Sequence, residues 1–391
     1  MAVFDKPKAG DASIVGDRKR PGPDVVTFVV MIALIAIGVL MIYASTREQL
    51  ELQNLDPGRL MQRQIMFAVV AVAVYVVGSL IDYREFRNYA AWVYVGTLAA
   101  LLLLLSPLIP AQEGVKRWID LGIFQVQPSE FAKITMAIVL ATVLAPARQE
   151  GMQWKRIAQS LFLVAIPALL IFLQPDLGTM LVFAFMSFIV LFAAGATWKQ
   201  LLTLVGGAAG FIALVFQRGL LKEYQIERLT AFYDPNADPL GPAYQQSQSV
   251  TAIGSGQLTG KGLFGGSLTN LDFVPEQETD FIFTAIGEQL GFFGSAVVIA
   301  AFVILLWRTF IIAATARDRF GSLLAVGIGS MIMFQVFVNI GMTMKIMPVT
   351  GLPLPFLSYG GSSLLTFAFS MGLLNSIWRR RSPVPGETYI V

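Results

Sequence analysis

The chain has no cysteine and no histidine among its 391 residues. The absence of cysteine excludes disulfide bonds, thiolate nucleophiles and cysteine-based metal sites. The absence of histidine excludes Ser-His-Asp catalysis, HExxH zinc sites and imidazole general bases. Any acid–base chemistry must therefore use aspartate, glutamate, lysine or tyrosine side chains.

Charged residues are also scarce. They make up 14% of the chain, whereas 55% of the residues are hydrophobic and the mean hydropathy is +0.67. A soluble domain has about 25% charged residues, so this chain has too few to cover a water-facing surface. The net charge is +3, and no basic stripe interleaves with aromatic residues, so nucleic acid is not an expected partner.

Long apolar runs recur along the chain, and about 20 apolar residues cross a hydrocarbon core about 30 Å thick. We predict an all-α, polytopic integral membrane protein with about ten transmembrane helices within residues 25–378. Residues 1–24 and 379–391 are predicted to be polar tails, the first of them disordered. The predicted spans are 25–44, 62–81, 90–109, 128–146, 157–174, 177–194, 199–217, 281–307, 321–344 and 355–378.

The distribution of lysine and arginine predicts the orientation of these spans. Both tails are basic, and most of the 28 basic residues lie on one side of the membrane if both termini are cytoplasmic. This topology places one large loop, residues 218–280, on the extracytoplasmic side. Long loops are usually functional or disordered, and the aromatic and apolar residues of this one favour packing against the helix ends. Residues 244–253 are predicted to form a short amphipathic helix.

The large loop ends in the sequence FVPEQETDFIF, where Glu276, Glu278 and Asp280 run directly into an apolar span. Asp280 has two interpretations of equal weight. It could cap the following helix, because carboxylates favour helix N-termini. It could instead be a general base, because partial desolvation and neighbouring acids raise the pKa of a carboxyl group.

Glu130 and Lys133, in VQPSEFAKI, lie three residues apart at the start of the fourth span. This spacing places them on one helix face, where they can pair. Ionisable groups that enter a membrane helix usually face a cavity or a partner. The pair is therefore either a purely structural ion pair or part of a hydrated substrate cavity.

Two other segments are candidates for binding phosphate. In an outer loop, Arg117 precedes a tryptophan; its forked donors could hold phosphate, or the segment could simply anchor at the interface. The run GSGQLTGKG resembles a Walker loop but fails that pattern at Ser255 and Gly262. It is either a flexible turn or a set of backbone amides that, with Lys261, contacts a pyrophosphate from outside.

The last span opens with PVTGLPLPFLSYGGSS, where prolines and paired glycines interrupt the regular helix. Irregular backbone at membrane depth requires satisfaction by protein or by a water-filled cavity. We therefore expect this segment, including Ser358, to line the same cavity and to bind substrate there. In LQPDLGT, Asp176 is predicted to cap the sixth span.

Taken together, these segments resemble the SEDS family (shape, elongation, division and sporulation) of cell-wall polymerases. The resemblance covers nearly the whole chain from about residue 25, in family order. The motifs are GVKRWIDLG, QPSEFAKI, QPDLGT, DPLGPAYQQSQSVTAIGSGQLTGKG, VPEQETDFIFTAIGEQLGFFG, NIGM and GLPLPFLSYGGSS. The ending GLPLPFLSYGGSS and the short N-terminal tail resemble the elongation members more than the division members.

The resemblance implies a peptidoglycan glycosyltransferase that polymerises lipid II on the outer face of the bacterial plasma membrane. It implies that Asp280 is the essential aspartate, that Glu130 and Lys133 line the central cavity, and that a class B penicillin-binding protein is the partner. The family often has histidine where this chain has Glu278. The extra negative charge could favour a divalent cation, Mg²⁺ or Mn²⁺, or shift the pH optimum; no organic cofactor is expected.

The mechanistic hypothesis is that Asp280 accepts the proton of a sugar 4-hydroxyl while undecaprenyl pyrophosphate leaves. Lys133, Arg117 and Lys261 are the candidates for neutralising the leaving group. Three alternatives stay open: a lipid flippase or transporter, a non-catalytic scaffold, and a division or sporulation paralogue. A transporter would be expected to show internal repeats, and the sequence shows none.

Overall fold

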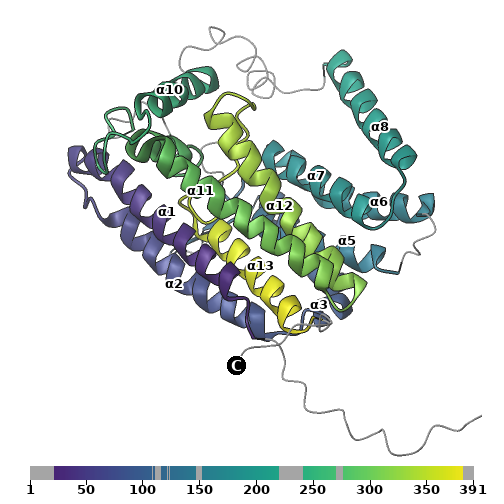
Figure 1. Cartoon of the computed structure of the whole chain (residues 1–391). Coiled ribbons are helices and arrows are strands. Elements are labelled where there is room, and N and C mark those ends of the chain that lie inside the picture. The colour runs from purple at the N-terminus through teal and green to yellow at the C-terminus, as the bar shows by residue number, and fades with distance from the viewer. Residues whose placement is uncertain are drawn as a thin grey trace, which may run out of the picture.

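The computed structural model describes residues 22–107, 109–110, 116–120, 122, 124–146, 152–219, 241–269 and 276–381. These residues form a bundle that is almost entirely helical (Figure 1). Its elements are α1 (Val25–Leu52), α2 (Arg59–Leu80), α3 (Glu85–Asn88), α4 (Ala90–Leu105), β1 (Ile119–Asp120), β2 (Gln125–Val126), α5 (Pro128–Leu144), α6 (Trp154–Leu173), α7 (Leu177–Ala193), α8 (Trp198–Gln217), α10 (Pro242–Ser255), α11 (Ile282–Thr315), α12 (Arg319–Thr343) and α13 (Gly361–Arg379).

Each predicted span coincides with a helix of the structure, which confirms an all-α polytopic membrane protein. Among the described residues, α1, α2, α6, α8, α11 and α12 are long and apolar enough to cross a membrane by length and composition. The helices α4 and α7 are apolar but shorter. Most of the predicted N-terminal tail, most of the C-terminal tail and residues 220–240 and 270–275 of the predicted outer loop lie outside the described residues.

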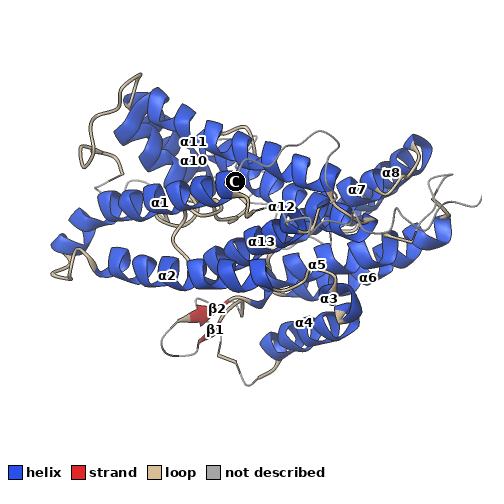
Figure 2. Cartoon of the chain, turned by 60° about the horizontal axis from the view of Figure 1, so that its bottom comes forward, coloured by secondary structure: helices blue, strands red, loops and turns tan. Residues whose placement is uncertain are grey.

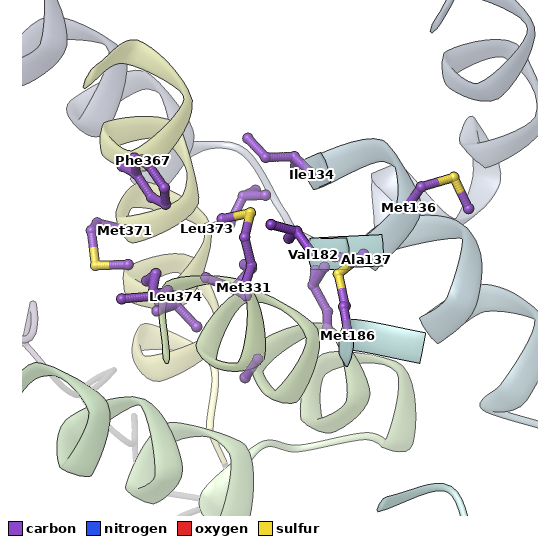
Figure 3. Packing of buried hydrophobic residues seen from close by; sticks show 14 of the residues in the cluster. Ile134, Met136, Ala137, Val182, Met186, Met331, Phe367, Met371, Leu373 and Leu374 are labelled. Atoms are coloured by element: carbon purple, nitrogen blue, oxygen red, sulfur yellow. The ribbon is translucent and has the colours of Figure 1, made fainter. Parts of the chain in front are cut away.

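The helices α5 and α13 occupy the centre of the protein, where nearly all of their residues are buried. Figure 3 shows side chains from four helices meeting there: Ile134 and Ala137 of α5, Val182 and Met186 of α7, Met331 of α12, and Phe367 and Met371 of α13. Because protein surrounds these two helices, they can carry polar side chains that lipid-facing helices could not.

Close contact between α2 and α13 depends on Gly78 and Gly372. A Cβ atom on Gly372 would lie 2.5 Å from the carbonyl oxygen of Tyr75 and 3.0 Å from the Cα atom of Gly78. Small residues allow membrane helices to approach at backbone distance. This contact holds the C-terminal halves of α2 and α13 together.

Both described chain ends lie at the same end of the bundle. The backbone N–H of Asp24, just before α1, donates a hydrogen bond of 2.8 Å to the side chain of Asn375, near the end of α13. The Asp24 carboxylate also accepts a bond of 2.9 Å from Arg308 near the end of α11. This arrangement agrees with an even number of membrane crossings.

The helix α11 is kinked at Gly291, where φ is +65°. A turn from the predicted outer loop enters the kink and exchanges backbone hydrogen bonds with the helix. The amides of Lys261 and Gly262 donate to the carbonyls of Glu288 and Gln289, at 3.0 and 3.1 Å. The amides of Phe292 and Phe293 in turn donate to the carbonyls of Gln257 and Leu258, at 2.9 and 3.1 Å. The carbonyl and amide groups that the kink frees are therefore satisfied.

The glycine run of the outer loop is explained by this contact. A Cβ atom on Gly260 would lie 2.1 Å from the carbonyl oxygen of Gln289, and one on Gly256 would lie 2.0 Å from that of Gly287. The run ends the short helix α10, which confirms the helix predicted at residues 244–253. The glycines thus provide close backbone packing against α11.

Candidate functional site

A cavity of about 790 Å³ opens at the end of the bundle opposite the described chain ends. Its wall includes the β1–β2 hairpin (Figure 2), in which Ile119 pairs with Val126, and the starts of α2, α5, α7 and α13. The turn before α11 and the segment 351–353 complete it. The lining residues that carry charge are Arg63, Arg117, Asp120, Glu130, Asp176, Glu276 and Asp280.

Glu130 and Lys133 form the ion pair that their spacing predicts. The Lys133 ammonium lies 2.7 Å from Glu130 Oε1, and the two residues are 0% and 1% exposed. Only Glu130 reaches the cavity lining, and its Oε2 atom has no hydrogen-bond partner among the described residues. A buried acceptor without a partner is costly, so Oε2 is a candidate acceptor for a hydrogen bond from a ligand.

Asp280 lies on the cavity wall in an irregular turn that precedes α11. The amides of Thr279, Asp280 and Phe281 all donate to the carbonyl of Glu276, at 3.3, 3.0 and 3.3 Å. The N-cap position of α11 is Phe281, without a side-chain capping bond. Both interpretations of Asp280 stay predictions: its partly exposed side chain lies just before the helix start and on the cavity wall, where a general base could meet a substrate.

Arg117 contributes positive charge to the same cavity. Its guanidinium donates to the carbonyls of Gln174, at 3.1 Å, and Pro175, in the turn between α6 and α7. An arginine has five N–H groups, so these two bonds orient the fork and leave other donors for an anion. Arg117, which the sequence predicts to bind phosphate, therefore lies on the cavity wall.

Arg63, from the first turns of α2, is a second cation on the wall, and it lies outside all of the sequence motifs described above. It is exposed and has no hydrogen-bond or ion-pair partner among the described residues. The sequence feature that could have indicated Arg63 is its position just inside an apolar run, in RLMQRQIMF. A charged residue at the edge of a membrane span usually faces a partner or a cavity. Hydropathy alone assigns it to the interface.

Lys261 and Ser358, by contrast, are not among the residues that line the cavity. Lys261 pairs with the buried carboxylate of Glu288 at 2.7 Å, and its amide is occupied at the α11 kink. The Ser358 hydroxyl accepts a 2.8 Å bond from the amide of Leu354 and so closes a local turn. Each therefore has a structural contact in the protein, and their predicted contacts with substrate stay predictions.

The segment around Ser358 nevertheless lines the cavity as predicted. Gly351, Leu352 and Pro353, before this serine, and residues 359–363, after it, all contribute to the wall. Asp176 caps α7 through a 3.0 Å bond from the amide of Thr179, which confirms the capping prediction. Asp176 also lines the cavity.

The acidic residues of the cavity do not form a metal cage. Among the described residues, no three Asp or Glu side chains gather closely enough to hold a metal ion. Glu278, at the position where the resemblance leads one to expect histidine, is not in the cavity lining, whereas Glu276 is. A divalent cation here would need further oxygen ligands, such as water or a phosphate group of a substrate.

Comparison with known proteins gives a consistent picture. A family model described as "Cell cycle protein", covering FtsW, RodA and SpoVE, matches residues 24–382. Stage V sporulation protein E of Bacillus subtilis is 37% identical over 364 residues, which are 92% of this chain and 98% of the relative. Peptidoglycan glycosyltransferase MrdB of Escherichia coli is 35% identical over 363 residues, 92% and 94% of the two chains.

A solved structure is similar along nearly the whole chain. It belongs to work on the structural coordination of polymerization and crosslinking by a peptidoglycan synthase complex. Its matching chain has a TM-score of 0.78 and 29% sequence identity, with coverage of 92% of this chain and 98% of that chain. The similarity therefore includes the helices that build the cavity.

Proposed function

Because this chain belongs to the FtsW, RodA and SpoVE family of cell cycle proteins, we propose that it polymerises lipid II at the outer face of the bacterial plasma membrane. It is a peptidoglycan glycosyltransferase, the activity that the name of its Escherichia coli relative states. The observation that carries the finer proposal is the cavity, where Arg117, Glu130 and Asp280 meet although they are distant in sequence.

In the proposed reaction, Asp280 is the general base. The 4-hydroxyl oxygen of one lipid-linked disaccharide attacks the anomeric carbon of the other and forms the new glycosidic bond. The bond from that carbon to the pyrophosphate oxygen breaks, and the hydroxyl proton passes to the Asp280 carboxylate. A single carboxylate suffices because a pyrophosphate needs no general acid once its charge is neutralised.

Among the described residues, Arg63 and Arg117 are the basic ones on the lining, so we assign them the pyrophosphate. Forked guanidinium donors suit phosphate oxygens. A divalent cation, Mg²⁺ or Mn²⁺, would add charge neutralisation there, with Glu276 as the protein carboxylate that holds it. Mg²⁺ typically combines one or two carboxylates with substrate phosphates. The assignment calls for no organic cofactor.

Glu130 is proposed to bind substrate through its unpartnered Oε2 atom. A sugar hydroxyl or an amide N–H of the disaccharide peptide would satisfy this acceptor. Lys133 does not line the cavity; its ammonium pairs with Oε1 and orients the buried Glu130 carboxylate. This role replaces the direct neutralisation of the leaving group expected of Lys133.

We further propose a role in cell elongation with a class B penicillin-binding protein as partner. The elongation-type ending GLPLPFLSYGGSS supports the first, and similarity to a chain of a peptidoglycan synthase complex supports the second. Identities of 37% to a sporulation protein and 35% to MrdB do not separate these roles. A deletion separates them: round cells support elongation, and filaments contradict it.

The orientation follows from the same reasoning. The two described chain ends lie together, and the basic Arg379, Arg380 and Arg381 lie at one of them. The positive-inside rule places this end in the cytoplasm and the cavity outside. Membrane lipids then surround the bundle, and the polyprenyl tails of both substrates remain in the bilayer.

The test uses the purified full-length chain with its transpeptidase partner and labelled lipid II in detergent and in vesicles. Glycan polymer of increasing length is the expected product. Transport of lipid II across vesicles without polymer would instead indicate a flippase. Partner binding with neither activity would indicate a scaffold, and either of these results would overturn the proposal.

A further inference from the structure

The helix α12 carries two buried amides one helical turn apart, Gln335 and Asn339. Both are 0% exposed, and most of their neighbours in the helix are apolar. Burying an amide without hydrogen bonds costs several kcal/mol in apolar surroundings. The hydrogen-bond partners of Gln335 and Asn339 therefore indicate the role of these two side chains.

Asn339 joins two walls of the cavity. Its Nδ2 atom donates one 2.8 Å bond to the backbone carbonyl of Asp280 and another 2.8 Å bond to that of Leu352. The orientation of the amide is fixed, because two carbonyl oxygens can face only its N–H groups. Asp280 and Leu352 both line the cavity, so one side chain holds together the turn before α11 and the segment before α13.

Gln335 makes the corresponding connection on the other side. Its Oε1 atom accepts a 3.0 Å bond from Lys133, and its Nε2 atom donates a 3.4 Å bond to the carbonyl of Pro353. Lys133 in turn holds Glu130 at 2.7 Å. The side-chain amides of Asn339 and Gln335 therefore donate hydrogen bonds to the adjacent backbone carbonyls of Leu352 and Pro353.

These contacts form one buried polar path across the site. It runs from Glu130 through Lys133 to Gln335, then along the 352–353 backbone to Asn339, and ends at the backbone of Asp280. The turn that carries Asp280 is irregular, with Glu276 at a φ of +56°. Asn339 supplies a side-chain contact to this turn from a regular, well-packed helix.

We propose that Gln335 and Asn339 are positioning residues that fix the Asp280 carboxylate relative to Glu130 across the cavity. This inference rests on the proposed function of Asp280 as the base. Neither amide is among the residues that line the cavity, so both act through groups that do. Small misplacements of a reacting group reduce the rate of the chemical step far more than they reduce binding.

The direct test is the near-isosteric variant Asn339→Leu in the full-length complex. We expect kcat for lipid II polymerisation to fall on the order of 10- to 100-fold, with lipid II binding unchanged within about 2-fold. The matched control is Ser330→Ala, also on α12 and buried, whose hydroxyl bonds only the Gly327 carbonyl of its own helix. The control should retain wild-type kcat.

Two further variants keep the test decisive. Asn339→Gln keeps the amide but moves its N–H donors by one carbon, so kcat should fall less than for Asn339→Leu. If Asn339→Leu does not fold, Asn339→Gln is measured in its place. Gln335→Met, which removes the contacts to Lys133 and Pro353, should also lower kcat with binding retained.

Wild-type kcat in the Asn339 variants would overturn the inference. A parallel loss of kcat, lipid II binding and thermal stability would also overturn it, by showing a structural role alone. Asp280→Asn in the same assay separates this failure from failure of the proposed function. If Asp280→Asn polymerises normally, the base assignment is wrong; if it is inactive while the Asn339 variants are normal, only the positioning role is wrong.

Discussion

The Lys133 ammonium lies 2.7 Å from Glu130 Oε1 with both side chains buried in the protein. Removing one partner of such a pair leaves an uncompensated buried charge, which typically costs about 3–5 kcal/mol. We therefore expect Lys133→Ala to lower the thermal unfolding midpoint of the detergent-solubilised protein and to abolish polymerisation.

A paired replacement separates stability from activity at this site. Glu130→Gln with Lys133→Met removes both charges and should recover much of the stability lost in Lys133→Ala. It should remain inactive, because the proposed acceptor at Glu130 Oε2 loses its charge. An active double variant would show that the ion pair is structural only.

Arg63 provides a test of the pyrophosphate assignment. Hydrogen bonds to charged groups contribute about 1.5–3 kcal/mol, so Arg63→Gln should raise the Kd for lipid II by roughly 10-fold or more. The fold should be unaffected because the side chain is exposed. The measurement is equilibrium binding of labelled lipid II.

The control for this prediction is Arg59→Gln. Arg59 is also exposed and lies one turn earlier on α2, but it is not in the cavity lining. Equal effects of the two substitutions would show general charge attraction and contradict the assignment of Arg63.

Gly260 and Gly262 form a matched pair for the contact at the α11 kink. Both have positive φ, +81° and +91°, so alanine strains the backbone at either position by about 1–2 kcal/mol. Only at Gly260 would the new Cβ atom also meet backbone, 2.1 Å from the Gln289 carbonyl oxygen. Gly260→Ala should therefore lower the unfolding midpoint more and expose residues 256–269 to protease. Equal decreases of the unfolding midpoint in Gly260→Ala and Gly262→Ala would mean that the backbone hydrogen bonds between the loop and α11 contribute little to stability.

Tyr83, at the end of the bundle where the chain ends lie, should give a pH signature at alkaline pH. Burial, together with the 2.6 Å hydrogen bond that its hydroxyl donates to Asp318, raises the pKa of Tyr83 to about 12. An unfolded tyrosine ionises near pH 10. The stabilisation is thus present below pH 10 and is lost as pH rises toward 12.

Thermal unfolding of wild type and Tyr83→Phe between pH 8 and about 12 checks this expectation. The wild type should be the more stable at pH 8, and the difference should shrink from about pH 10 upward. A difference that stays constant across this range would contradict the raised pKa of Tyr83.

Hydropathy predicts the spans well because the bilayer core imposes a length and a composition on each helix. The Glu130–Lys133 pair was also predictable, since a spacing of three residues is decided within one helix. In both cases the information is local in sequence. The same holds for the Asp176 cap, which bonds an amide only three residues away.

The remaining features depend on partners distant in sequence. Lys261 pairs with Glu288, and no local pattern links a loop lysine to a glutamate inside a later span. Asp280 stays a possible helix cap because α11 begins two residues later, whereas the turn that precedes the helix closes on the Glu276 carbonyl. Asn339 in NIGM was part of a motif, yet its bond to Asp280 appears only when α12 packs against that turn.

In the proposed reaction, Asp280 removes the proton from the attacking hydroxyl. Single-turnover polymerisation of labelled lipid II by Asp280→Asn, with equilibrium binding measured in parallel, tests it most directly. Asp120→Asn, an exposed aspartate of the same cavity, is the matched control. We expect Asp280→Asn to bind lipid II normally but to react at least about 100-fold more slowly, and Asp120→Asn to react at the wild-type rate. Chain growth at the wild-type rate by Asp280→Asn would contradict it.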